Sequence, residues 1–524
     1  MTSRRNIIAA LLGVAAVITV AALLRAEPTE DAPRPAPLHS AATPAATADS
    51  SVAGSAQFQQ AANLGKYQGI ENCVRCHTKP QQGEKSVPDH VKLTEAVTWS
   101  GDDKHHLAYD HLRDGLGQRI GQRLNANVFD PATGCIQCHA APDATARAKA
   151  DPLHQPILGV DCEACHGPGK NWVGEHQKHD TWYARSRDEK TNLGFIDIRS
   201  PVSRAELCLS CHSGSPADGR VITHAMYAAG HPPLTGFEIE TFSEMMPRHW
   251  RYPYQKPGAT SASFERTRNM LVSSVVALRM AMELTVADAA ADNQLERWPE
   301  FARLDCFVCH HDVDQADWRR HQSGAFALGR PRLITGCLPL VAVAARAVQG
   351  PAADVKLNAL IERLQTPFET SAFGDPAEIV QRGTSIIASC RNLERQLESA
   401  PLSPDAVRDV LHAIAAQTSA EDCDFDTARQ LFGAWSIVWQ ELVDNHVLPT
   451  SKNVERGIAS GKTLFSLGSA KPAGSAATAP PARSVTDELT DLFGNRAKYK
   501  PQKFARAMAK LDALAAEPQI NPGQ

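Results

Sequence analysis

The chain has 524 residues, which is enough for two or three domains of roughly 150 residues each. Its formal net charge of -4 argues against nucleic acid as a partner. Aromatic residues make up only 6% of the chain, so a core of ordinary size would need another source of apolar packing surface.

Residues 1–26 have the pattern of an export signal or of an N-terminal membrane anchor. Arg4 and Arg5 precede an uncharged apolar run over residues 7–24, and this order predicts export. The run is long for a cleaved signal and short for a membrane span, so both a signal peptide and an anchor remain open. Either one predicts a periplasmic location, with or without attachment to the inner membrane. Residues 27–57 are rich in Ala, Pro and Thr and predict a flexible linker.

Residues 58–330 contain five copies of the motif Cys-x-x-Cys-His. Its cysteines are Cys73 and Cys76, Cys135 and Cys138, Cys162 and Cys165, Cys208 and Cys211, and Cys306 and Cys309. The histidines that follow are His77, His139, His166, His212 and His310. Two such thiols bond to the vinyl groups of one haem, and the histidine binds the iron as its proximal ligand. Zinc sites do not need a histidine at this position in every copy, and disulfides have no use for one. The sequence therefore predicts a pentahaem domain with five covalently bound haem c groups.

The predicted fold class is mainly α. Residues 58–330 have few periodic segments, so we expect short helices and loops packed around haems, with one long helix over residues 264–290. Residues 331–465 keep helical apolar spacing in several segments and predict an antiparallel helical bundle. Residues 466–484 form an Ala/Pro/Ser linker, and residues 485–524 predict a short helical C-terminal tail that docks on the bundle or on a partner.

Three cysteines lie outside the motifs: Cys337, Cys390 and Cys423. In an oxidising compartment this odd number suggests one disulfide and one buried thiol. Cys390 with Cys423 is the pair to test, although Cys390 also fits a small core residue on an apolar helix face.

The second axial ligand of each iron decides whether a small molecule can bind there. The chain has 20 histidines, and most of those outside the motifs lie in the haem region. Their number therefore does not limit ligation by two histidines, but it does not say which histidine serves which haem.

The residues around the motifs resemble those of the multihaem cytochrome c-552/c-554 family. The similar segments are residues 99–109, 159–179, 224–250 and 304–312. The resemblance implies an electron-transfer role and haems with two histidine ligands, in stacked and perpendicular pairs. By position it implies the distal ligands His105, His176 or His179, His224, His231 and His249, with His106 as a close alternative to His105. Tetrahaem members of the family have one haem with an open site, and five motifs leave open which iron, if any, is open here.

We therefore expect an exported pentahaem cytochrome that carries electrons between a membrane or periplasmic donor and an acceptor. The redox partners expected are a quinol-oxidising membrane complex or soluble cytochromes. The alternative is a reductase or oxidase of small nitrogen or sulfur compounds with one open-site haem, for which Arg248, His249, Arg251 and Tyr252 are a candidate pocket. A haem-containing sensor or assembly subunit is a third hypothesis. No distinctive catalytic motif occurs, so no catalytic residue is predicted and an enzyme is the less favoured class.

Overall fold

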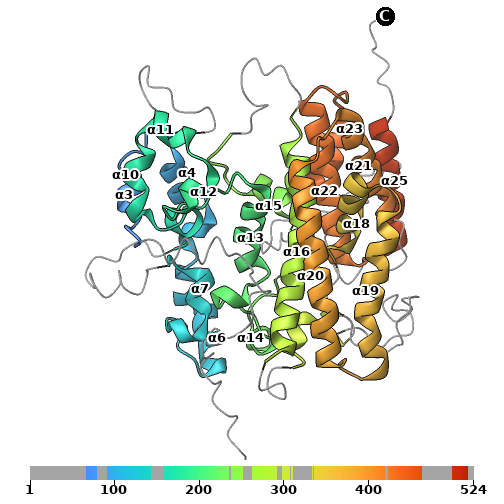
Figure 1. Ribbon diagram of the computed structural model, residues 1–524, viewed down its shortest axis with the longest axis horizontal. Coiled ribbons are helices and arrows are strands. Elements are labelled where there is room, and N and C mark those ends of the chain that lie inside the picture. The colour runs from blue at the N-terminus through green and yellow to red at the C-terminus, as the bar shows by residue number, and fades with distance from the viewer. Residues whose placement is uncertain are drawn as a thin grey trace, which may run out of the picture. The chain divides into compact units, whose positions relative to one another are not determined.

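The computed structural model describes residues 66–79, 91–142, 159–234, 236, 238–251, 263–291, 298–306, 309, 310, 333, 336–418, 423–462 and 499–516 (Figure 1). Within these residues every regular element is a helix, and extended segments pair only in isolated bridges such as that between Val91 and Trp250. This confirms the mainly α fold class. The predicted signal or anchor and both linkers lie outside the described residues.

The haem motifs lie among short helices. These are α3 (Glu71–Val74), α4 (Glu95–Gly101), α5 (Asp110–Arg113), α6 (Gly115–Leu124), α7 (Cys135–His139), α9 (Cys162–His166), α10 (Val173–His176), α11 (His179–Ala184), α12 (Arg187–Thr191), α13 (Pro201–His212), α14 (His224–Ala229) and α15 (Ile239–Met245). Among the described residues, 3-10 turns lie between and after them: η1 (Lys104–Leu107), η2 (Pro131–Thr133), η3 (Gly169–Asn171), η4 (Pro216–Asp218) and η6 (Phe301–Arg303). Local signals explain several boundaries: Ser200 caps α13 with Pro201 at its first position, and Gly230 ends α14 in the left-handed conformation.

Longer helices form the bundle. They are α16 (Glu265–Ala289), α18 (Leu338–Gln349), α19 (Ala353–Thr370), α20 (Pro376–Ser399), α21 (Pro404–Gln417), α22 (Phe425–Asp444), α23 (Lys452–Lys462) and α25 (Pro501–Ala516). Their apolar faces share one core, in which Trp435, Trp439 and Phe432 of α22 are fully buried. Helix α25 packs on α21, α22 and α23, so this part of the tail docks on the bundle, as one of the two alternatives predicted.

Helix α16 lies in the sequence region of the haems but packs within the bundle. It contacts α20 most extensively, then α13, α18 and α22 (Figure 1). Nearly every side chain of α16 is buried, which explains why its sequence is apolar on all sides. Among the described helices α16 alone is long and apolar enough to cross a membrane, but 83% of its apolar window is buried within the protein, as in a core helix. The bundle therefore includes a helix that comes before the predicted domain boundary near residue 330.

A buried arginine joins the haem region to the bundle. Arg279 of α16 is 2% exposed at its side chain and lies 2.7 Å from Glu206 of α13, 2.7 Å from Glu394 of α20 and 3.1 Å from Glu283. Because α13 ends in the fourth haem motif, this cluster connects that motif directly to two bundle helices.

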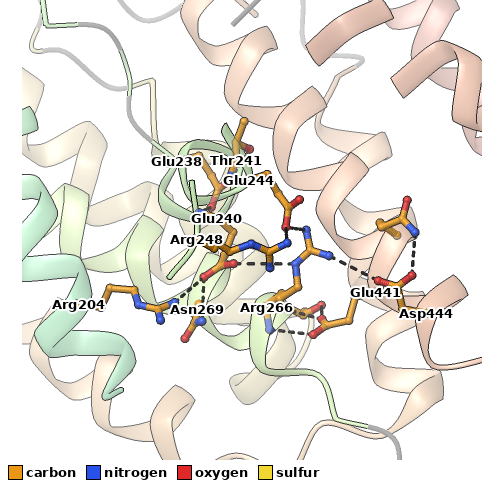
Figure 2. A network of polar contacts seen from close by, with 12 residues as sticks. Arg204, Glu238, Glu240, Thr241, Glu244, Arg248, Arg266, Asn269, Glu441 and Asp444 are labelled. Carbon is orange, nitrogen blue, oxygen red and sulfur yellow. Dashed lines mark hydrogen bonds and ion pairs between the residues drawn. The ribbon is translucent and has the colours of Figure 1, made fainter. Parts of the chain in front are cut away.

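A second buried cluster lies where α15 meets α16 and α22 (Figure 2). The guanidinium of Arg266 lies 2.6 Å from Glu244 and 4.0 Å from Glu240. The carboxylate of Glu441 accepts hydrogen bonds of 2.8 Å from the backbone N–H groups of Arg266 and Thr267 at the start of α16. Opposite charges thus compensate one another where the solvent is excluded.

The three cysteines outside the motifs are all free thiols. Cys390 and Cys423 are both buried in the bundle core. Cys390 is therefore a small core residue in this structure, and the predicted disulfide is absent.

Candidate haem-binding site

Three of the five motifs lie in helices that end at the motif histidine. The motifs of residues 135–139 and 162–166 are the helices α7 and α9, and α13 ends in the motif of residues 208–212. Cysteines three positions apart lie on the same side of a helix. The short helix therefore presents both thiols of a motif to one haem edge.

Four of the five motif histidines face a second histidine ring. The pairs are His77 with His176, His139 with His231, His212 with His105, and His310 with His224. In each pair the ring centroids lie 6.3 Å apart. Two imidazoles that bind one metal ion from opposite sides, with metal–nitrogen bonds of about 2 Å, have centroids roughly 6 Å apart. The four pairs therefore fit haem irons with two histidine ligands.

The pairs fall into two classes by ring orientation. The planes of His77 and His176 differ by 15°, and those of His224 and His310 differ by 29°. The planes differ by 88° for His105 and His212 and by 81° for His139 and His231.

The structure distinguishes between the alternative distal ligands. His176 faces His77, whereas the adjacent candidate His179 lies against Tyr183 with a centroid distance of 6.0 Å. His105 faces His212, whereas the ring of His106 lies edge-on to Trp99.

Ring nitrogens that face away from the partner histidine are held by hydrogen bonds. His139 donates from Nδ1 to the carbonyl of Ala108 at 3.1 Å, and His231 donates to the carbonyl of Pro232 at 2.7 Å. His176 donates to the carbonyl of Val173 at 2.5 Å. A hydrogen bond at Nδ1 sets the ring orientation and leaves Nε2 for the metal.

Two other rings are bound to carboxylates instead. His77 Nδ1 lies 2.9 Å from Glu95 Oε2, and His105 Nδ1 lies 2.8 Å from Asp103 Oδ1. The sequence did not single out either carboxylate. Asp103 stands two positions before His105, which is a weak signal, but the distance of Glu95 from His77 in sequence carries none.

Burial keeps several of these imidazoles in the neutral form that binds iron. It lowers the pKa of His212 to about 4, and it also lowers the pKa values of His139, His176 and His231. For His105 the hydrogen bond to Asp103 raises the pKa instead.

His166, the histidine of the third motif, has a different environment. Within the described residues no ring contact pairs it with another histidine; its ring stacks on Phe195 at 5.9 Å. Burial lowers its pKa to about 4, and the charge of the nearby His249 acts in the same direction. The Nδ1 atoms of His166 and His249 are both buried without a hydrogen-bond partner. His249 is therefore near this motif, but the two rings do not have the geometry of the other four pairs.

Contacts between motifs place them in an order that differs from their order in the sequence. The thiols of Cys73 and Cys162 lie close enough to shift each other's pKa, so the first and third motifs are neighbours. Cys165 of the third motif interacts electrostatically with Cys208 and Cys211 of the fourth.

The second and fifth motifs continue the same row. The thiols of Cys138 and Cys211 lie close enough to shift each other's pKa, so the second and fourth motifs are also neighbours. Helix α14 begins at His224, which faces the fifth motif, and is followed by His231, which faces the second. In space the motifs therefore form a row in the order first, third, fourth, second and fifth.

Glu163, inside the third motif, holds the first and third motifs together. Its buried carboxylate accepts hydrogen bonds from the backbone N–H groups of Gln68 at 2.9 Å, Gly69 at 2.7 Å and Gly169 at 2.6 Å. The segment that leads into the first motif is thus fixed to the third. The role of Glu163 depends on contacts between residues far apart in the sequence, so the motif alone did not reveal it.

Comparisons with known proteins support haem binding by these motifs. Residues 73–167 match the family described as cytochrome c554 and c-prime. The chain is 25% identical over 189 residues to cytochrome c-554 of Nitrosomonas europaea, an alignment that covers 34% of this chain and 72% of the relative. No solved structure matches. The haem motifs and this similarity support the cytochrome c554 family of c-type cytochromes, whose members carry covalently bound haem c.

Proposed function

We infer that the chain is an exported electron carrier with five haems, four of which have two histidine ligands. The observation that carries this proposal is the set of four histidine pairs with a common centroid distance of 6.3 Å. An iron bound by two histidines has no vacant position for a substrate, but it can still accept and release an electron.

The order of the motifs supports a path for electrons through the protein. Cys76 of the first motif and Cys306 and Cys309 of the fifth are exposed, and these two motifs end the row. The third and fourth motifs, in the interior of the row, have only partly exposed cysteines. Electrons would enter at one exposed end and leave at the other.

The cellular context is part of the same proposal. The basic and apolar pattern of residues 1–26 supports export to the periplasm, either through a cleaved signal or with an anchor in the inner membrane. The partners proposed are other redox proteins: a quinol-oxidising membrane complex or soluble cytochromes at one end, and an acceptor of electrons at the other.

The haem content and the ligation can be tested together. Intact mass of the protein from a host that attaches haem c should exceed the mass of the polypeptide by five haems. Electron paramagnetic resonance of the oxidised protein should show low-spin signals that cyanide and nitrite leave unchanged at four haems. Fewer attached haems, or high-spin iron at most sites, would refute the proposal.

A second candidate function is the reduction or oxidation of a small nitrogen or sulfur compound at the third haem. It is favoured by the absence, among the described residues, of a histidine ring paired with His166. Glu95 and Asp103, as well as Lys92 and Arg204, act electrostatically on His249, so charged groups of both signs lie close to this site. Of the predicted pocket residues, Arg248 lies 3.3 Å from Glu244, and Tyr252 lies outside the described residues. A high-spin signal that shifts with nitrite or hydroxylamine, followed by turnover of that compound, would support this function.

A further inference from the structure

We propose that Glu95 and Asp103 are positioning residues that lower the reduction potentials of the haems at the first and fourth motifs. The inference rests on the haem ligation proposed above. The two carboxylates would give different reduction potentials to haems that have the same two axial ligands.

Glu95 is held so that one carboxylate oxygen faces His77. Its Oε1 accepts hydrogen bonds from the backbone N–H groups of Lys92 at 2.7 Å and Leu93 at 3.1 Å. Leu93 has a positive φ of 57°, a conformation that non-glycine residues rarely adopt. With Oε1 occupied, Oε2 accepts the Nδ1–H of His77 at 2.9 Å. These contacts fix both the direction of the carboxylate and the orientation of the ring.

Asp103 has the same relation to His105, which faces the fourth motif. Asp103 is only 5% exposed, and it caps the turn η1. Its Oδ1 accepts hydrogen bonds from the backbone N–H of His105 at 3.0 Å and from Nδ1 of the same residue at 2.8 Å. The hydrogen bond from the backbone thus holds the carboxylate beside the ring, in the orientation in which the ring faces His212.

Among the described residues, the pair of His139 and His231 at the second motif has no carboxylate at this position. The rings of His139, His176 and His231 donate to neutral backbone carbonyls. His166 and His249, near the third motif, have buried Nδ1 atoms without a hydrogen-bond partner. The Nδ1 atoms of different axial histidines therefore have different partners. Some donate to a carboxylate, some donate to a neutral carbonyl, and some have no acceptor.

The charge of the acceptor determines how much electron density the histidine donates to iron. A carboxylate draws the Nδ1 proton toward itself and makes Nε2 a stronger donor. Stronger donation stabilises ferric iron relative to ferrous iron, so the reduction potential falls. The haems at the first and fourth motifs should consequently be harder to reduce than haems whose histidines donate only to carbonyls.

The test is a redox titration followed by electron paramagnetic resonance, on the full-length holoprotein and on Glu95→Gln and Asp103→Asn. Each amide keeps an oxygen acceptor but removes the charge. The near-parallel rings of His77 and His176 and the near-perpendicular rings of His105 and His212 give different low-spin spectra, so the two haems can be followed separately. We expect E95Q to raise the midpoint potential of one near-parallel haem and D103N to raise that of one near-perpendicular haem.

Glu175→Gln is the matched control. Glu175 precedes the axial candidate His176, but its carboxylate pairs with Lys178 at 2.6 Å and Arg185 at 2.8 Å rather than with a ring. We expect a clearly smaller shift for E175Q than for E95Q. Equal shifts in both variants would mean that the charge acts at a distance without the hydrogen bond, and would overturn the inference.

Mass spectrometry separates this inference from the proposed function. A variant that retains its haems and its low-spin signals, but also the midpoint potentials of the wild type, refutes the role of the carboxylate and leaves the proposed function intact. A wild-type protein without haem at the first or fourth motif refutes the proposed function itself. If one variant fails to bind haem, the midpoint potentials of the other variant still test the inference, because Glu95 and Asp103 act on different histidines.

Discussion

The imidazole rings of His105 and His212 lie 6.3 Å apart and are nearly perpendicular, with 88° between their planes. His105 follows a turn capped by Asp103, and His212 ends the helix α13, so two elements with separate local constraints determine this angle. The pair His77 and His176 has the same distance but an angle of 15°. The chain thus produces two kinds of histidine pair from the same ligand type.

The first prediction concerns these angles. Near-perpendicular imidazole planes make the low-spin ferric signal more anisotropic than near-parallel planes do. We expect the oxidised holoprotein to give two highly anisotropic low-spin signals, from the pairs at 88° and 81°, and two rhombic signals, from the pairs at 15° and 29°. Electron paramagnetic resonance at low temperature measures this directly. Four signals of a single type would contradict the described ring orientations.

The second prediction separates two neighbouring histidines. His176→Ala should convert one haem to high-spin iron that binds cyanide, because it removes the ring that faces His77. His179→Ala is the matched control and should leave all low-spin signals in place, because His179 contacts Tyr183 instead. The ultraviolet-visible and electron paramagnetic resonance spectra of both variants check this. The reverse pattern would assign the ligand to His179.

The third prediction concerns Glu163 and the contact between the first and third motifs. Glu163→Ala leaves three backbone N–H groups without their acceptor, and those of Gly69 and Gly169 are buried. We expect the free energy of unfolding to fall by about 3 kcal/mol. Urea unfolding followed by circular dichroism measures the change. Glu175→Ala removes a partly exposed carboxylate from the same region, and its effect should stay within about 1 kcal/mol.

The fourth prediction concerns the buried arginine of α16. Arg279→Met leaves Glu206, Glu283 and Glu394 without their shared cation and should lower the free energy of unfolding by about 3–5 kcal/mol. The control is Arg382→Met, which removes one partner of the surface pair with Glu378 and should cost about 1 kcal/mol or less. Equal effects would show that the buried cluster does not depend on its arginine. Urea unfolding again gives both values.

The fifth prediction is a pH dependence from Glu441. Burial raises the pKa of this carboxyl from 4.5 to about 7 in the folded protein. Between these two pH values the folded protein binds more protons than the unfolded chain, so the contribution of Glu441 to stability is lost as the pH rises from about 4.5 to about 7. Glu441→Gln cannot ionise and should decrease the slope of the free energy of unfolding against pH in this interval. An unchanged slope would contradict the raised pKa.

The sequence alone determined the chemistry of the haem motifs. Thioether attachment and proximal ligation need only the spacing of two cysteines and one histidine along a short helix, and this information is local. The mainly α fold class could also be predicted from local sequence. The bundle helices α20, α21 and α22 each have an N-terminal cap and an apolar stripe at helical spacing.

The tertiary structure alone decided which histidine faces which motif. His176 and His179 stand three residues apart at the junction of α10 and α11, and only the placement of these two helices relative to the first motif distinguishes them. The contact of Cys73 with Cys162 and the position of α16 within the bundle likewise depend on residues that are distant in the sequence. The physical reason is common to all three: periodicity and spacing report on local backbone geometry, whereas ligation and core packing depend on where the folded chain brings separate segments together.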